Sequence, residues 1–417
     1  ERDGGDRRLD AMFKPAHSQD AACVEATAWG GADREKWRRE LSVISDHDLL
    51  AVVRQAFSRA EKEERFDPEA ALKLLRRTDS EGRRILPEGN PLFAAALGEV
   101  LVERGLADVQ SMSATELLRS ILEREVKAWR RSGVDGLHLN LLVYATLVHR
   151  VVDVEKDVPR AIAGLLPGPE IVKHEWCEAL SAYAAAGTHA ASAVAMLEPD
   201  RLGELFVLDR LAGDAAVLSS NENAYSARTA AEALWSHLWM ESSESARAAL
   251  TFMKRAASDF PQHLALLKVV TPPLTSPTPP AASVEVAPGA IEAWLMVVPE
   301  MCGQMTKWGG YHAAKCCFEA AIAAVKDVRG KGIGPALDRL NGQLLLDHSM
   351  LVFRLDGPHF AKAHADGALE VFQRRVRELN TPEARRDVSV SLDNVANVEL
   401  ALGRNDDALK RFQQSLD

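Results

Sequence analysis

Apolar residues recur every three or four positions along most of this chain, which is the spacing of one buried face of an α-helix. Helix start signals precede several of these stretches: Asp67-Pro68 puts a proline at the first helical position, and Gly89-Asn90-Pro91-Leu92 opens the next helix. A capping box at Ser113–Glu116 opens the clearest amphipathic stripe, formed by Leu118, Leu122, Val126 and Trp129. The pattern predicts an all-α fold, a multi-domain helical array that ends in helical hairpins.

Breaks in the pattern divide the chain into five segments. The first residues show neither helical nor alternating periodicity, and the stretch around residue 280 is rich in proline and nearly free of charge. A proline-rich stretch of this kind is typical of an extended linker between domains. The predicted organisation is an irregular tail (1–35), a helical domain (36–132), a second helical region with a hairpin (133–271), a proline-rich linker (272–290) and repeat-like hairpins (291–417).

Composition and charge limit the classes of partner. The chain has 417 residues, of which 47% are hydrophobic and 26% charged, and this composition is typical of soluble globular proteins. Its formal net charge of -10 repels nucleic-acid backbones and acidic membrane surfaces. The five cysteines have irregular spacing, which favours free thiols in a reducing compartment. We therefore expect a cytoplasmic protein that binds neither nucleic acid nor membranes.

Motifs for catalysis are absent from the sequence. There is no phosphate loop of the form G-x-x-x-x-G-K-[ST], no H-E-x-x-H, no G-x-S-x-G and no dinucleotide fingerprint. The best metal candidate combines thiols and an imidazole on neighbouring helical segments: Cys302, His312, Cys316 and Cys317. Structural zinc sites usually contain a C-x-x-C knuckle, which is missing here, so we interpret these cysteines as packing residues. We expect no enzyme activity, no catalytic residues and no metal.

The last hairpin has the residue pattern of a tetratricopeptide (TPR) repeat. Small residues at Ala396 and Ala408 would let two antiparallel helices approach closely, and Gly403 would make the turn between them. The full set of matching positions is Leu392, Val395, Ala396, Gly403, Ala408 and Phe412. A second, degenerate match consists of Cys302, Gly309, Ala314, Phe318 and Ala321. The two matches are not a whole number of repeats apart, so the helices between them are predicted to form an enlarged or irregular unit.

Several short stretches, in this order, resemble the C-terminal half of bacterial STAND proteins, the signal-transduction ATPases. These are Ser45–Leu50, Glu88–Phe93, Leu197–Glu204 and Arg255–Pro261. The resemblance implies a helical lid at 36–132, a winged-helix-like region within 133–271 and TPR repeats at the end. It also implies that Pro91 is the lid residue that packs against a nucleotide, with Gly89 shaping the turn. Because the phosphate loop is missing, we expect no cofactor in this chain, and ATP or ADP only if an ATPase core lies upstream.

Stacked helical hairpins leave a long surface suited to peptides and proteins. The repeat frame predicts that Asp393, Asn394, Asn397, Leu400 and Ala401 lie on this surface. The expected function is therefore that of a regulatory and sensing module of a STAND-like signalling protein, whose partner is a protein, a peptide or another copy of the same chain. The alternative is a free-standing TPR adaptor or scaffold with no relation to an ATPase.

Overall fold

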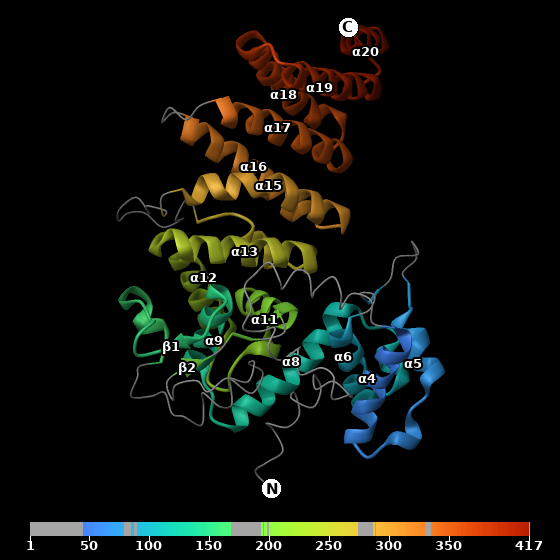
Figure 1. The fold of residues 1–417 in the computed structure, drawn as a ribbon, viewed down its shortest axis with the longest axis vertical. Helices are drawn as coiled ribbons and strands as arrows, with labels where there is room; N and C mark the ends of the chain where they lie inside the picture. The colour runs from blue at the N-terminus through green and yellow to red at the C-terminus, as the bar shows by residue number, and fades with distance from the viewer. Residues whose placement is uncertain are drawn as a thin grey trace. The chain divides into compact units, whose positions relative to one another are not determined.

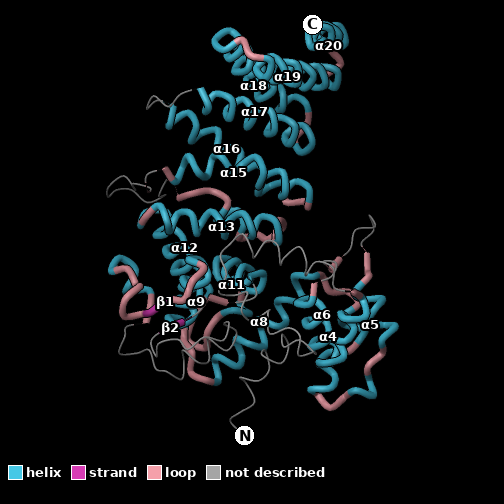
Figure 2. The backbone as a smooth tube through the Cα atoms, viewed as in Figure 1, coloured by secondary structure: helices cyan, strands magenta, loops and turns pink. Residues whose placement is uncertain are grey.

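The computed structural model describes residues 45–78, 85–86, 90–167, 193–194, 196–197, 200–273, 287, 289–329 and 335–416. The predicted tail, Gly89 and most of the predicted linker lie outside these ranges. Helices dominate the described residues, and one antiparallel pair of two-residue strands, β1 (Val152–Asp153) and β2 (Ala193–Val194), lies among them (Figure 2). The all-α fold class is confirmed. No described helix combines the length and the apolar character needed to cross a bilayer.

The chain divides into two units, one made of residues 1–146 and 150–227 and the other of 147–149 and 228–417. This division differs from the predicted one, because helices on both sides of the 272–290 segment pack into the second unit. The Trp294 indole N–H donates to the Val270 carbonyl (3.2 Å), and the backbone N–H of Ala287 donates to the Trp239 carbonyl (2.8 Å). The proline-rich segment therefore connects two helices of one packed unit.

The first unit begins with predicted helices whose caps can be checked. Helices start at Pro68, Pro91 and Ala114 as predicted; the side chains of Asp67 and Asn90 cap the first two of these, and Ser113 caps the third with the predicted capping box. The first described helix is capped by Ser45, whose hydroxyl accepts from the backbone N–H of Asp48 (3.2 Å). The elements are α4 (Asp46–Arg59), η3 (Glu63–Arg65), α5 (Pro68–Leu75), α6 (Pro91–Arg104), α7 (Leu106–Val109), α8 (Ala114–Arg131), α9 (Gly136–Val148), η4 (Arg160–Leu165), α11 (Asp200–Ala212) and η5 (Ala215–Val217).

Buried ion pairs join distant parts of the first unit. Arg210 on α11 is fully buried; its guanidinium donates to both carboxylate oxygens of Glu222 and to the side-chain oxygen of Asn140 on α9 (2.6 Å). The Arg119 guanidinium on α8 makes a two-point contact with the buried carboxylate of Asp209, at 2.6 and 3.1 Å. Arg210 and Asn140 are 70 positions apart and Arg119 and Asp209 are 90 apart, so these contacts join elements that are not chain neighbours.

The second unit is a stack of helices in chain order (Figure 1). From α15 onward each helix packs against the next one along the chain. Short glycine turns close two of the hairpins, since Gly309 and Gly403 have φ of 86° and 76°, values that L residues with a side chain rarely adopt. The helices are α12 (Ala224–Glu241), α13 (Ser243–Asp259), α14 (Leu266–Val269), α15 (Ala290–Lys307), α16 (Tyr311–Arg329), α17 (Pro335–Leu355), α18 (Pro358–Leu379), α19 (Pro382–Ala401) and α20 (Asn405–Leu416).

The residues that suggested repeats lie where two packed hairpins need them. In the pairs α15–α16 and α19–α20 the non-glycine positions of the repeat frame are buried, except for half-buried Phe412. Between these pairs α17 and α18 are longer, with 21 and 22 residues, and form the predicted enlarged unit. The hairpins follow the predicted pattern, while their identity as TPR repeats stays a prediction.

Candidate functional site

Three helices of the second unit, α15, α17 and α19, form a row in which each contacts the next directly. We call these helices the odd-helix row. The Asn394 amide on α19 donates to the Ser349 hydroxyl on α17 (3.1 Å), and Arg339 on α17 forms an ion pair with Asp387 on α19 (3.2 Å). The even-numbered helices lie between these three in the chain and pack against them, so each member of the row has one side left for solvent or for a partner.

Helix α15 exposes a stripe of residues three or four positions apart, which is one helical face, whereas the exposed faces of α17 and α19 are interrupted, with no exposed residue between Arg339 and Met350 or between Val390 and Asn397. The stripes contain large apolar side chains, with exposed fractions of 71% for Met296, 51% for Met350 and 47% for Val390. We call the exposed stripes together the odd-row surface: Met296, Glu300, Gly303 and Lys307; Arg339, Met350 and Arg354; Glu383, Arg386, Val390, Asn397 and Ala401.

The exposed faces of α16 and α18 differ in character from the odd-row surface, whereas α20 at the end of the array exposes the apolar residues Leu409 and Leu416. Helix α16 exposes mainly polar residues, and the middle of α18 exposes polar and charged ones. On α18 the large exposed apolar residues are Phe360 and Leu379, which lie near its two ends. The stripe residues are His312, Cys316, Glu319 and Lys326 on α16, and Asp366, Glu370, Gln373 and Arg377 on α18. Of the two faces, the odd-row surface therefore has the composition that suits a protein partner, with flexible methionines among charged residues.

The predicted partner-binding residues fall into two groups. Asn397, Leu400 and Ala401 are exposed. Asp393 is half-buried and accepts a hydrogen bond from the Ser415 hydroxyl on α20 (2.6 Å), and half-buried Asn394 is bound to Ser349. The last two side chains therefore connect α19 to its neighbours, and their role in the array is at least partly structural.

Met296, Met350 and Val390 were missed by the sequence analysis. The repeat frame assigned surface positions only in the last hairpin, and α17 has no repeat signature to fix the phase of its exposed face. Only the contacts of α17 with its neighbours identify Met350 as the side chain left outside.

The predicted nucleotide-lid motif is only partly described. Pro91 is the first residue of α6, and the Asn90 side chain caps this helix by accepting from the backbone N–H of Leu92 (3.0 Å). Gly89 lies outside the described residues. The first unit also has a pocket of about 390 Å³, but its lining includes Leu101 to Leu106, at the opposite end of α6 from Pro91. The predicted motif and this pocket are therefore separate features.

The cysteine cluster does not converge on one point. Cys302 and Cys317 are buried, and their thiols donate to the carbonyls of Ala314 (3.7 Å) and Val270 (3.3 Å). Burial raises the pKa of the Cys302 thiol well above its ordinary value. His312 and Cys316 are exposed on α16. No group of three ligating side chains able to hold a metal ion is present among the described residues.

A polar group is buried where α16, α17 and α18 meet. The ring of His348 on α17 is 98% or more buried and lies 4.3 Å from the ring of His364 on α18, centre to centre, and 5.9 Å from that of Phe318. Burial lowers the pKa of His348 to about 4, and the neighbouring His364 and Lys315 add to this effect. Burial also raises the pKa of Asp347, the preceding residue, to about 6, despite the hydrogen bond that its carboxylate accepts from Gln343 (2.8 Å).

Comparison of the chain with protein-family models, curated proteins and solved structures gives no match. The functional argument therefore depends on the geometry of the two units and on the sequence patterns alone.

Proposed function

We propose that this chain is a regulatory and sensing module of a STAND-like signalling protein, and that it binds a protein partner through the odd-row surface. The observation that carries the proposal is the row α15, α17 and α19, whose exposed stripes each contain one large apolar residue, Met296, Met350 or Val390. Helical arrays bind proteins along such continuous rows, because each helix adds one stripe to a shared surface. Large exposed apolar residues rimmed by charges are typical of interaction surfaces.

The STAND part of the proposal is supported by sequence order. Glu88–Phe93, Leu197–Glu204 and Arg255–Pro261 resemble the family's lid and the regions after it, and the helical array follows them in the chain. In such an arrangement a partner bound to the array would control an ATPase core supplied by another segment. The sequence encoded before Glu1 separates this proposal from the alternative of a free-standing adaptor, since a phosphate-loop domain there is required by the first and excluded by the second.

The binding proposal can be tested with charge substitutions on matched faces. Met350→Glu together with Val390→Glu places two carboxylates on the odd-row surface, and Ala363→Glu with Gln373→Glu places two on the exposed face of α18. Partners captured by the wild-type chain are identified by cross-linking mass spectrometry, and their Kd values are measured with purified proteins; self-association is followed by analytical ultracentrifugation.

The odd-row pair should weaken association by about tenfold or more, because an apolar contact is replaced by a desolvated charge. The α18 pair should change the Kd less than twofold, and both variants should keep the helicity of the wild type. Association that survives the odd-row pair, and also deletion of residues 291–417, would exclude the array as the binding site.

A further inference from the structure

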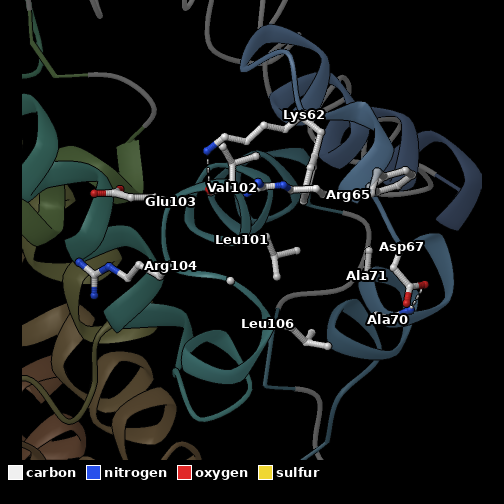
Figure 3. A pocket seen from close by; sticks show the side chains of 13 residues that line it. Lys62, Arg65, Asp67, Ala70, Ala71, Leu101, Val102, Glu103, Arg104 and Leu106 are labelled. Atoms are coloured by element: carbon white, nitrogen blue, oxygen red, sulfur yellow. Dashed lines mark hydrogen bonds between the residues drawn. The ribbon is translucent and has the colours of Figure 1, made fainter.

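The pocket of the first unit is formed by two turns that follow helix ends (Figure 3). On one side the chain leaves α4, passes through η3 and enters α5; on the other side α6 ends at Gly105 and α7 begins. The pocket volume of about 390 Å³ is within the range found for small-molecule sites in proteins. The pocket lies within one unit, so its shape does not depend on the position of the array.

The floor and walls of the pocket are apolar. Phe57 and Phe66 lie with ring centres 5.4 Å apart, and Leu101, Leu106 and Ala71 complete the lining from α6, α7 and α5. Of these, Leu106 is 40% exposed although it is a large apolar residue. The pocket therefore offers apolar contacts that solvent reaches from the rim.

Most charges at the rim already have partners. The Lys62 ammonium donates to the Val102 carbonyl at the end of α6 (3.3 Å), the Asp67 carboxylate caps α5, and Arg104 lies 3.5 Å from Glu123. In Figure 3 the side chains of Glu103 and Arg104 point away from the hollow. Asp67 and Arg104 are thereby engaged in the walls, whereas the Lys62 ammonium, bound to a neutral carbonyl, keeps its positive charge at the rim.

Arg65 differs from these residues. Its side chain is 69% exposed, and its described ion pair, with neighbouring Glu64, spans 3.9 Å, beyond hydrogen-bond distance. Figure 3 shows this side chain crossing from η3 toward Val102 over the pocket. A guanidinium has five N–H donors and prefers carboxylates and related oxyanions, which it can bind at two points.

The backbone that positions these cations is a hydrogen-bonded helix ending, in which the N–H of Glu61 donates to the Ser58 carbonyl (3.0 Å) and that of Lys62 to the Phe57 carbonyl (2.9 Å). Glu61, between α4 and Lys62, has a φ of 55°, the left-handed region that a residue with a side chain rarely adopts. This turn directs Lys62 to the end of α6 and brings η3 with Arg65 to the rim.

We propose that this pocket binds a small organic anion with an apolar body, in which Arg65 holds the carboxylate or sulfonate and the rings of Phe57 and Phe66 contact the hydrocarbon part. A ligand of up to roughly 20 non-hydrogen atoms fits a pocket of this size. The site is distinct from the proposed protein-binding surface, and its occupation adds a small-molecule input to the first unit.

Calorimetric titration of the full chain tests the proposal with octanoate and 2-naphthoate as anions and octan-1-ol as the uncharged analogue of octanoate. Both carboxylates should bind saturably, and octanoate about tenfold more tightly than octan-1-ol, because a charge-assisted hydrogen bond is lost in the alcohol. Arg65→Gln should remove this tenfold difference. Lys73→Gln is the matched control, since Lys73 is an exposed cation on α5 that does not line the pocket, and it should leave both affinities within twofold.

A second pair of variants tests the location. Ala70→Trp fills the pocket from α5 and should abolish binding of all three compounds; if this variant loses helicity, Leu106→Trp at the exposed rim serves the same purpose. Binding that is unchanged by these variants would locate the compounds elsewhere and overturn the proposal. Binding lost on filling but insensitive to Arg65→Gln would overturn the role of Arg65, equal affinities for octanoate and octan-1-ol would overturn the choice of an anion, and the absence of saturable binding would exclude the site.

Discussion

The two units of this protein are held together in opposite ways. In the first unit, charged side chains bind polar partners far away in the chain: Arg119 pairs with Asp209, and Arg210 donates to the amide oxygen of Asn140. From α15 to α20 in the second unit, each helix packs mainly on its neighbours in the chain, through small residues such as Ala361, Ala365 and Ala396. The first arrangement depends on every element being present. The second depends on local fit between adjacent helices.

This difference has consequences for stability and function. A buried charge that loses its partner is costly wherever it lies, so damage to the first unit should spread through all elements that share the ion pairs. An array of neighbouring helices behaves approximately as a chain of local interfaces, in which damage is largest near the altered helix. The array can therefore present a partner surface whose parts are adjusted one helix at a time.

Breaking the central ion pair of the first unit should give the largest effect. Arg210→Ala leaves Glu222, whose side chain is only 8% exposed, and Asn140 without their guanidinium, and should lower the free energy of unfolding by about 3–5 kcal/mol. Urea unfolding with hydrogen exchange read peptide by peptide should show faster exchange throughout α8, α9 and α11. The exposed Arg131 is the control, and Arg131→Ala should cost about 0.5 kcal/mol or less. An Arg210→Ala chain as stable as this control would contradict the comparison.

The corresponding disturbance in the array should be smaller and confined to a few helices. A Cβ built on Gly342 of α17 would lie 2.5 Å from the ring of Phe372 on α18, and that ring is 1% exposed and has little space to move. Gly342→Ala should therefore destabilise the second unit by up to about 3 kcal/mol through overpacking. Hydrogen exchange should increase mainly in α17 and α18, and an equal increase in the first unit would show that the array is not locally organised.

Sequence reasoning predicted the helices of both units better than their contacts. The start signals at Asp67, Asn90 and Ser113 were right because capping is a local interaction, read from three or four adjacent residues. The repeat frame likewise predicted the buried and turn positions of two hairpins, since small residues and glycine mark close helix contacts. The division into units was not predicted, because a proline-rich composition identifies an extended segment but not whether the helices at its ends pack together.

The candidate binding sites could likewise be predicted from the sequence only in part. Asn397, Leu400 and Ala401 are exposed as expected, whereas the phase of α17 that exposes Met350 depends on which neighbours cover its other sides. The pocket of the first unit combines residues around Arg65 with residues around Leu101, and nothing in either stretch indicates the other. Surfaces and pockets made by separate elements require the tertiary structure.

Two buried groups of α17, His348 and Asp347, make the stability of the array depend on pH with opposite signs. Folded His348 has a pKa of about 4 against an ordinary value of 6.5, so the unfolded chain binds more protons than the folded chain between these pH values. The stability that neutral His348 contributes is therefore lost as pH falls from 6.5 to 4. By linkage the array should be roughly 2 kcal/mol less stable at pH 5 than at pH 7 from this group alone. His348→Phe should remove this loss and leave the opposite dependence of Asp347, so that the urea midpoint of the variant is higher at pH 5 than at pH 7.

Titration of Asp347 changes the stability of the array in the opposite direction. Its folded pKa of about 6 lies above the ordinary 3.8, so the stability it contributes is present below pH 3.8 and is lost as pH rises through 6. Asp347→Asn should therefore stabilise the chain at pH 7 and make the acid-side loss steeper. Parallel pH curves for the wild type, His348→Phe and Asp347→Asn would show that neither group titrates as its burial predicts.

The smallest expected effect is a gain in stability, which tests whether a stabilising substitution in the array acts as locally as a destabilising one. Gly303 lies inside α15, where a built Cβ would meet no other atom within 4 Å, unlike that of Gly342. Alanine is the better helix former, and it also restricts the unfolded chain, so Gly303→Ala should stabilise the second unit by about 0.5–1 kcal/mol. Slower hydrogen exchange should appear in α15 and in its neighbours α13 and α16, with the first unit unchanged.

Because Gly303 belongs to the odd-row surface, the same variant also measures how tightly a partner approaches α15. An unchanged partner Kd is expected, since one methyl group is added at an open position. A stability loss instead would mean that a side chain covers this position, and the assignment of α15 to the odd-row surface would then be wrong.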